Sequence, residues 1–284
     1  MSDPVAAISE ADATGEIAEI FADIRQVYRV GVVNLIWRHL ATFPGALRWV
    51  WDSVKPLYVD GTIEREAAVL RAAIAIPELP AIPAAAFAGV GLSKADLDQI
   101  RAVLAAYDRT NAMALVALSA VELRITEPLE NHGDAGAAFT SLPTPTQLEI
   151  QLPALLDLEE MSPTTAELVL AMNRIGASND APVLASMYRH LARWPAYLAL
   201  AWTMVAPLES NIRLDTAIVD VLGKARASGR RLATRLPAPW PSLGPAARAD
   251  ISEALARFTG DVIAKMVVIC ALLRRLTPAT HGGE

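Results

Sequence analysis

Residues 38–57, RHLATFPGALRWVWDSVKPL, return as residues 189–208, RHLARWPAYLALAWTMVAPL, with ten of twenty aligned positions identical and no gap. The offset between the two stretches is 151 residues (189 − 38). The same offset aligns Glu16 with Glu167 and Arg124 with Arg275. Solenoid and propeller repeats are far shorter, about 20 to 50 residues. The sequence therefore predicts a tandem duplication whose two copies pack as the subunits of a twofold dimer do.

Apolar residues recur three and four positions apart along most of the chain, as at Ile17, Ile20, Phe21 and Ile24. This period is typical of amphipathic helices, and we find no convincing alternation of period two. We therefore predict an all-α protein with about six helices in each copy. The first copy is expected to form helices near 15–28, 31–41, 44–58, 62–76, 94–107 and 110–125, repeated 151 residues later.

The two copies are predicted to occupy residues 1–130 and 162–284, joined by a linker, 131–161, that is rich in glycine, proline and threonine. A pocket between such copies receives similar elements from both sides, while related positions are free to carry different side chains. We expect either a monomer with an internal pseudo-twofold axis or a homodimer.

Composition favours a large buried core, since 53% of the 284 residues are hydrophobic. The best candidate for a membrane span, Val262 to Leu273, is interrupted by Lys265 and falls short of the 18 or so apolar residues that a span needs. We interpret it as a buried helix. The first residues lack the basic and apolar regions of a signal peptide, so a cytoplasmic location is expected.

A net charge of −6 argues against nucleic acid as a partner, because such binding depends on neutralising phosphates. The basic residues between Lys224 and Arg235 are interpreted as a solvated helix face. The single cysteine, Cys270, excludes an internal disulfide and a redox pair, and its apolar neighbours indicate a place in the core.

Several stretches resemble the group I 2-haloacid dehalogenases. They are 15–25 (GEIAEIFADIR), 40–45 (LATFPG) and, in the second copy, 191–195 (LARWP). The resemblance extends over nearly the whole chain. It implies a pseudo-dimeric helical fold, distantly related to the AhpD-like proteins, with one active site between the halves.

The resemblance also implies a chemistry. Members of that family hydrolyse 2-haloalkanoates: an aspartate activates a water, an asparagine helps to position it, and the water displaces halide with inversion. A carboxylate acting as general base must hold the water in line with the carbon–halogen bond. The substrate would be a small carboxylate, and neither a metal nor an organic cofactor is needed.

Asn111 matches the water-positioning asparagine of the family. It stands at the start of an apolar run, and the related position in the second copy is Val262. A polar residue opposite an apolar one is what an asymmetric pocket on a pseudo-twofold axis would show. The alternative is that Asn111, following Thr110, only caps a helix.

Similar enzymes have Ser-Asp and an aromatic residue where this chain has Ser186, Met187 and Tyr188. Met187 thus takes the position of the general base, and a thioether cannot accept a proton from water. Asp180, seven residues earlier, is a substitute base if the segment is helical, since seven residues are about 10 Å of helix. The other interpretation, which we favour, is that Asp180 caps a helix before Pro182.

Three further positions belong to the pocket expected from the resemblance. The family's aromatic wall falls on Val32 and Leu35, and Phe258 replaces a tyrosine.

A histidine beside an arginine occurs at the same place in both copies, at His39 and His190. Such a pair could form a metal or anion site, but without acidic or cysteine ligands nearby we interpret both as hydrogen-bonded structural residues. The adjacent Arg38 and Arg189 are either carboxylate ligands or surface residues.

Two hypotheses follow. In the first, the protein is a hydrolase that acts on carbon–halogen bonds of 2-haloalkanoates with a relocated or different base. In the second, it is a non-catalytic protein of the same fold that binds a small carboxylate or serves a structural role.

Overall fold

The computed structural model describes residues 5–127, 152–209, 211–237 and 245–278. All regular secondary structure in these residues is helical, which confirms the predicted all-α class. Most of the predicted linker, 131–161, lies outside the described residues, so the domain boundaries stay a prediction. Within the described part of the chain, no helix is both long enough and apolar enough to cross a bilayer.

The N-terminal half contains α1 (Gly15–Tyr28), α2 (Leu35–Leu40), α3 (Ala46–Val59), α4 (Thr62–Ala72), α5 (Ala84–Gly89) and α6 (Lys94–Thr126). The C-terminal half contains η1 (Leu158–Glu160), α7 (Pro163–Arg174), α8 (Ser186–Leu191), α9 (Pro195–Val205), η2 (Ala206–Leu208), α10 (Ile212–Ala233), α11 (Pro245–Arg257), η3 (Phe258–Ile263) and α12 (Ala264–Leu276).

The helix bounds of the two halves follow the sequence offset of 151. Adding 151 to the bounds of α2 gives those of α8, and adding it to the start of α6 gives the start of α11. The segment α11–η3–α12 then runs to Leu276, one residue short of the end expected from α6. These bounds support the predicted duplication, which remains an inference from the sequence.

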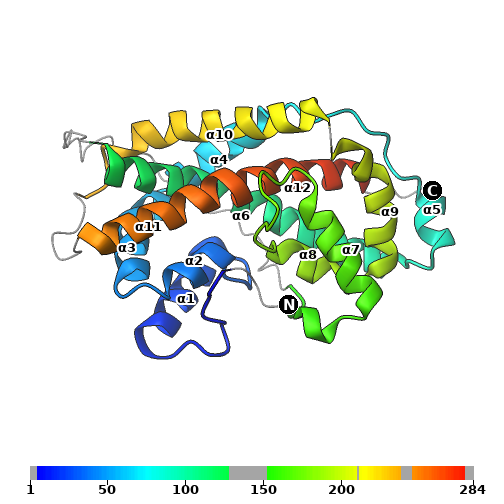
Figure 1. Cartoon of the computed structure of the whole chain (residues 1–284), viewed down its shortest axis with the longest axis horizontal. Helices are drawn as coiled ribbons and strands as arrows, with labels where there is room; N and C mark the ends of the chain where they lie inside the picture. The colour runs from blue at the N-terminus through cyan, green and yellow to red at the C-terminus, as the bar shows by residue number, and fades with distance from the viewer. Residues whose placement is uncertain (1–4, 128–151, 210, 238–244, 279–284) are drawn as a thin grey trace.

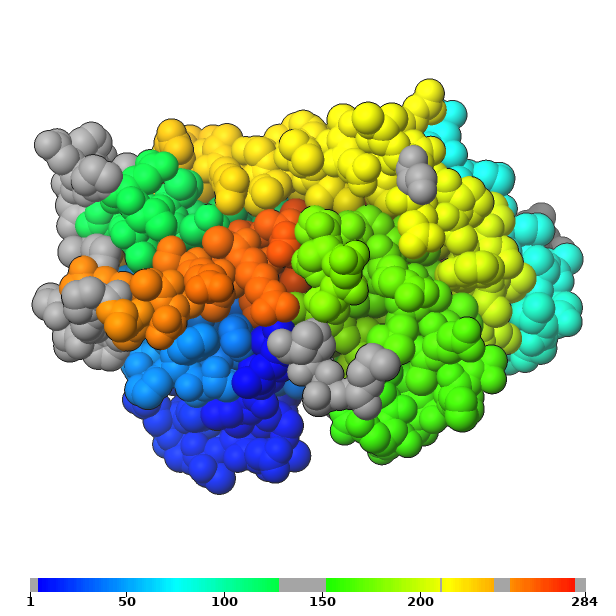
Figure 2. All heavy atoms as spheres, in the orientation of Figure 1, coloured from blue at the N-terminus to red at the C-terminus, as the bar shows by residue number. Residues whose placement is uncertain are grey.

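Helix α6 lies at the centre of the molecule. Helix α6 packs against α4, α10, α11 and α12, and Figure 1 shows α10 and α11–α12 running across the molecule with it. The short helices α1 and α2 lie below them on one side and α7 and α8 on the other. In Figure 2 the residues of α1 and α7 form two separate projections on this face.

The prediction differs from the structure in three places: α5 was not predicted, the helix expected at 31–41 begins only at Leu35, and α6 was divided in two. Two helices were expected at 94–107 and 110–125, but α6 is continuous through both. The polar triplet Asp108, Arg109 and Thr110 interrupts the apolar pattern without containing glycine or proline. Its side chains find partners inside the protein, so the backbone continues as a helix. Every residue from Thr110 to Val121 is buried.

Helices α6 and α10 approach closely at Gly229. A Cβ atom at this position would lie 2.9 Å from the Ala120 nitrogen and 2.9 Å from the Ser119 carbonyl carbon. Both neighbours are backbone atoms of a buried helix, so neither can move alone. Glycine at this position therefore allows α10 to pack on the central helix.

We predict that Gly229→Ala destabilises the protein by about 1–3 kcal/mol, the usual cost of overpacking a core. The helix propensity of alanine offsets only about 1 kcal/mol of this cost. Gly223→Ala is the matched control on the same helix, because no atom lies within 4 Å of its added Cβ. That variant should gain stability. Urea unfolding of both variants tests the packing, and equal effects would contradict it.

Candidate functional site

A cavity lies where the two halves meet, between α2, α6, α8 and the η3–α12 segment. Its volume is about 30 Å³, which suits a ligand of a few atoms. Its lining residues are Asn34, Leu35, Ile36, Tyr107, Asn111, Ala185, Ser186, Met187, Phe258, Val262, Ile263 and Met266.

Ten of these twelve lining residues form five pairs separated by 151 positions. Equivalent residues of the two halves therefore line the cavity, as expected for a pocket on a pseudo-twofold axis. The pairs are Asn34 with Ala185, Leu35 with Ser186, Ile36 with Met187, Tyr107 with Phe258, and Asn111 with Val262.

The paired positions differ in polarity. In three pairs the N-terminal half supplies the hydrogen-bonding residue (Asn34, Tyr107 and Asn111) and the C-terminal half an apolar one. Ser186 is the exception, facing Leu35. We call the side formed by Asn34, Tyr107 and Asn111 the polar wall and the side formed by η3 and α12 the apolar wall, but the surface that faces the open space is almost entirely apolar.

Asn34 and Asn111 form a side-chain pair on the polar wall. The Asn34 amide nitrogen donates to the Asn111 Oδ1 at 3.3 Å, and its distance to the Thr110 hydroxyl is 3.5 Å. Both asparagines are 7% exposed. The Asn34 Oδ1 is buried and has no hydrogen-bond partner among the described residues. Asn111 therefore acts as more than a helix cap, since it lies deep within α6.

Ser186 links the cavity to a buried cation. Arg38 is 6% exposed and donates from its guanidinium to the Ser186 Oγ at 3.2 Å. Because the serine oxygen accepts this bond, its own proton is available to a ligand. Arg189 behaves differently, since it binds the Leu156 carbonyl oxygen at 2.8 Å and forms an ion pair with Asp157. Because Arg38 is buried, the interpretation of Arg38 as a surface residue is wrong.

Hydrogen bonds from side chains to the backbone fix the segments that lead into α2 and α8. Asn173 accepts from the backbone nitrogen of Ala185 at 3.2 Å and donates to the carbonyl oxygen of Val183 at 3.1 Å. Lys265, 1% exposed, donates to the Asn173 carbonyl oxygen at 2.6 Å. In the first half Glu10 accepts from the backbone nitrogen of Val33 at 2.8 Å. Different residues therefore hold related segments.

The apolar wall contains a π-helical turn. Residues Phe258–Ile263 form η3, whereas the related residues of α6 are α-helical. A π turn changes the direction of side chains and is frequent at functional sites. Three residues of η3 line the cavity, Phe258, Val262 and Ile263. Phe258 is also stacked on His39, with ring centroids 5.3 Å apart.

The repeated histidines are hydrogen-bonded, as the structural interpretation expects. His39 Nδ1 lies 2.7 Å from the Ala6 carbonyl oxygen, and His190 Nδ1 lies 2.9 Å from the Tyr107 hydroxyl. Burial lowers the pKa of His190 from 6.5 to about 4, so this ring is neutral at pH 7. The described residues contain no group of three or more acidic, histidine or cysteine side chains placed to hold a metal ion.

Comparison with known proteins identifies this arrangement. The family model described as "Halocarboxylic acid dehydrogenase DehI" matches residues 31–188, more than half of the chain.

The chain belongs to the DehI family.

Curated relatives agree with this assignment. A configuration-inverting 2-haloacid dehalogenase from Alcaligenes xylosoxydans xylosoxydans is 26% identical over 79% of this chain and 76% of its own length. An (R)-2-haloacid dehalogenase from Pseudomonas putida is 25% identical over 87% of this chain and 82% of its own length. Among solved structures, a D-2-haloacid dehalogenase complex with L-LA superposes with a TM-score of 0.81, at 19% identity over 97% of both chains. The fold of this DehI member is thus that of the solved dehalogenase.

Five of the predicted site residues line the cavity: Leu35, Asn111, Ser186, Met187 and Phe258. Val32 is buried nearby but is not among the lining residues. The cavity-lining residues Asn34 and Tyr107 were missed by the sequence analysis. The signal that revealed Asn111 was available for both, because the offset of 151 sets them against Ala185 and Phe258.

Asp180 does not lie at the cavity. It is exposed, in the non-helical connection between α7 and α8, and is not a lining residue. Asp180 was predicted either to share a helical face with Met187 or to cap the helix before Pro182. Both predictions are wrong, because α8 begins at Ser186 and has Ala185 as its N-cap. No helical face joins Asp180 to Met187, and Asp180 caps no helix.

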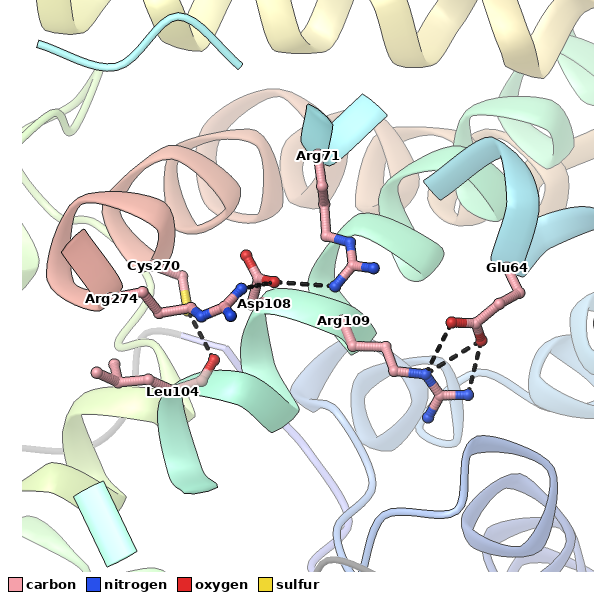
Figure 3. Close-up of polar contacts among 7 residues, drawn as sticks. All are labelled: Glu64, Arg71, Leu104, Asp108, Arg109, Cys270 and Arg274. Atoms are coloured by element: carbon pink, nitrogen blue, oxygen red, sulfur yellow. Dashed lines mark hydrogen bonds and ion pairs between the residues drawn. The ribbon is translucent and has the colours of Figure 1, made fainter. Parts of the chain in front are cut away.

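Two carboxylates near the polar wall are engaged in ion pairs. Asp108, one residue from Tyr107, lies between Arg71, at 2.9 Å, and Arg274, as Figure 3 shows. Glu64 accepts two guanidinium nitrogens of Arg109, the closer at 2.6 Å. Both carboxylates are thus engaged by arginines, and neither is among the residues that line the cavity.

The lowered pKa of His190 predicts a loss of stability in mild acid. Between pH 6.5 and about 4 the unfolded chain binds a proton at His190 that the folded protein does not. The free energy of unfolding should therefore fall with pH through this window, by about 3 kcal/mol in total. Urea unfolding at several pH values, compared with His190→Gln, isolates this contribution from that of the carboxylates. The same pH dependence in both proteins would contradict it.

Proposed function

We propose that this DehI-family protein binds a small 2-substituted carboxylate in the central cavity and does not hydrolyse it by the aspartate-assisted route. One observation carries the proposal: Met187, 1% exposed, lines the cavity at the position where the resemblance puts the general base. The lining set, all of it within the described residues, contains no aspartate, glutamate or histidine.

Water attack on a saturated carbon needs a group that accepts a proton as the new carbon–oxygen bond forms. A carboxylate in hydrogen-bond reach of the water supplies this acceptor, and a thioether sulfur does not. The Tyr107 hydroxyl is already engaged with His190. Its pKa is raised well above 10 by burial, so it is not a base at neutral pH.

The surroundings of the cavity favour an anionic ligand. Arg38 brings a buried guanidinium to the Ser186 hydroxyl. Because that oxygen accepts from Arg38, the hydroxyl proton would be free to donate to a bound carboxylate. Hydrogen bonds that involve a charged partner are the strong ones. The apolar wall of Val262, Ile263 and Met266 would receive the short alkyl part of the same ligand.

A second candidate is hydrolysis of 2-haloalkanoates with a relocated base. It is favoured by Asn111 and Ser186, which remain at the cavity, and by relatives that are named 2-haloacid dehalogenases. Asp180 would serve only if the connection between α7 and α8 brought it inward, since it is exposed in the structure. The same assay separates the two candidates.

We predict that the unmodified protein releases no halide from D- or L-2-chloropropanoate or from the bromo analogues above the uncatalysed rate. Met187→Asp should release it, because the new carboxylate takes the proton of a water while the water oxygen displaces halide from the α-carbon. A positioned general base contributes typically about 10²–10⁴-fold. Halide release by purified protein is the measurement.

Met187→Asn is the matched control, since it is similar in size to aspartate and accepts no proton from water. It should stay at the background rate. Halide release by the unmodified protein at a rate like that of Met187→Asp would contradict the proposal and favour the second candidate. Circular dichroism of each variant shows whether the buried substitution has left the helices intact.

We also predict that Ser186→Ala weakens the binding of 2-chloropropanoate about tenfold or more, because a hydrogen bond to a charged group is lost. Ser119→Ala is the control, a buried serine on α6 outside the cavity-lining set. It should leave the affinity unchanged. Titration calorimetry gives both dissociation constants, and an equal affinity in the two variants would argue against Ser186 as the carboxylate ligand.

A further inference from the structure

Helix α9 exposes a tryptophan where the related helix of the first half, α3, buries one. Trp202 is 39% exposed, whereas Trp51, which precedes it by 151 positions, is 1% exposed. Trp51 donates to Asp23 at 2.7 Å and contacts the ring of Tyr28, and both partners belong to α1. Helix α7 ends at Arg174, five residues before the position related to Tyr28. The turn of α1 that packs on Trp51 therefore has no counterpart at Trp202.

The two helices also differ in the charge of their outer faces. On α3, Arg48 pairs with Glu16 at 2.9 Å and Lys55 pairs with Asp23 at 2.7 Å. These ion pairs join α3 to α1 and keep this face of the first half polar. The first half thus shows what this helix face looks like when it is exposed to water.

The outer face of α9 has lost these charges. Ala199 and Ala206 stand at the positions related to Arg48 and Lys55, and α9 itself contains no charged residue. Pro195, Ala199, Trp202 and Ala206 are spaced four, three and four residues apart, so they share one side of the helix. We call these four residues the α9 strip.

Helix α7, which packs against α9, carries two exposed charges of opposite sign. Figure 1 shows the two helices next to each other at one end of the molecule. Glu167 and Arg174 stand at the positions related to Glu16 and Asp23. Both are exposed, and neither forms an ion pair with another residue that the structure describes. Seven residues separate them, which places them on one face of α7 about 10 Å apart.

We propose that the α9 strip, with Glu167 and Arg174 beside it, is an interface between two copies of this chain. A twofold axis between the two charges would bring Glu167 of each copy to Arg174 of the other, because each surface of a twofold dimer meets itself in reverse. The charges of one copy thus complement those of the second copy. The uncharged α9 strip meets its own copy without repulsion.

The chemistry of the strip agrees with this occupant. The centres of homodimer interfaces are more apolar than other protein surfaces and are poor in charged residues. Tryptophan is among the residues that contribute most to such interfaces when it becomes fully buried. Trp202 is therefore the central contact of the proposed dimer, and Glu167 and Arg174 determine its orientation.

The first experiment is sedimentation velocity of the purified full chain over a wide range of protein concentration. We expect a species of twice the 30.3 kDa of the chain. Trp202→Glu should weaken the dimer at least about thirtyfold, because a central aromatic contact is lost and a charge is buried. Val59→Glu is the matched control, since Val59 is 68% exposed and lies at the end of α3, outside the proposed interface. It should leave the dimer unchanged.

The second experiment exchanges the two charges. Glu167→Arg and Arg174→Glu each place like charges opposite one another across the twofold axis, so each should weaken the dimer. The variant that carries both changes restores opposite signs and should recover it. Both residues are exposed, and circular dichroism of each variant shows whether the helices are intact.

Each result decides the proposal. A chain that is monomeric at every concentration overturns it, and so does a dimer that Trp202→Glu leaves unchanged, since its interface then lies elsewhere. Recovery in the doubly changed variant supports the twofold arrangement, because the two residues are too far apart in one chain to pair with each other. Failure to recover overturns that arrangement. None of these outcomes depends on what the cavity binds.

Discussion

Every residue of α6 from Thr110 to Val121 is buried, and the polar side chains of Asp108 and Asn111 take their partners from other segments of the protein. Asp108 is 4% exposed and takes its partners from α4 and α12, through Arg71 and Arg274. Asn111 takes its partner from the residue before α2. A charge or amide left alone at these positions would cost several kcal/mol. The polar groups of α6 therefore determine how the two halves are joined and where the polar wall of the cavity lies.

The Asp108 cluster shows how the halves depend on each other. Two arginines, one from each half, share one buried carboxylate, and nearby Cys270 donates from its Sγ to the Leu104 carbonyl oxygen at 3.2 Å (Figure 3). Removal of a single partner from a buried ion pair is more damaging than replacement of the whole cluster by apolar residues. The cluster is thus better understood as fixing the register of α6 against α12 than as a source of net stability. That register places Tyr107 and Asn111 opposite Phe258 and Val262.

Much of this arrangement could be predicted from the sequence, because the repeat at an offset of 151 carries three-dimensional information. It aligns α2 with α8 residue by residue, and it sets Asn111 against Val262 in the cavity wall. The continuity of α6 could not be predicted, since Asp108 and Arg109 interrupt the apolar period and their partners lie far away in the chain. Arg38 was ambiguous for the same reason, because Ser186, its hydrogen-bond partner at the start of α8, is 148 residues away. The position of Asp180 was wrong because the helix that it was assumed to enter begins at Ser186.

The cavity is asymmetric in a way that the cavity of a symmetric homodimer cannot be. In a homodimer a cavity on the twofold axis receives identical residues from both subunits, so a polar wall on one side requires the same wall on the other. A single chain is free of this constraint, and here Asn34, Tyr107 and Asn111 face Ala185, Phe258 and Val262. A small ligand with one polar and one apolar end can then bind in a single orientation. Under the proposed function, the absence of a carboxylate at Met187 would remove proton transfer but leave that orientation in place, because the groups that set it belong to other residues. Binding and hydrolysis would then depend on separate side chains, so that one function could be lost while the other is kept.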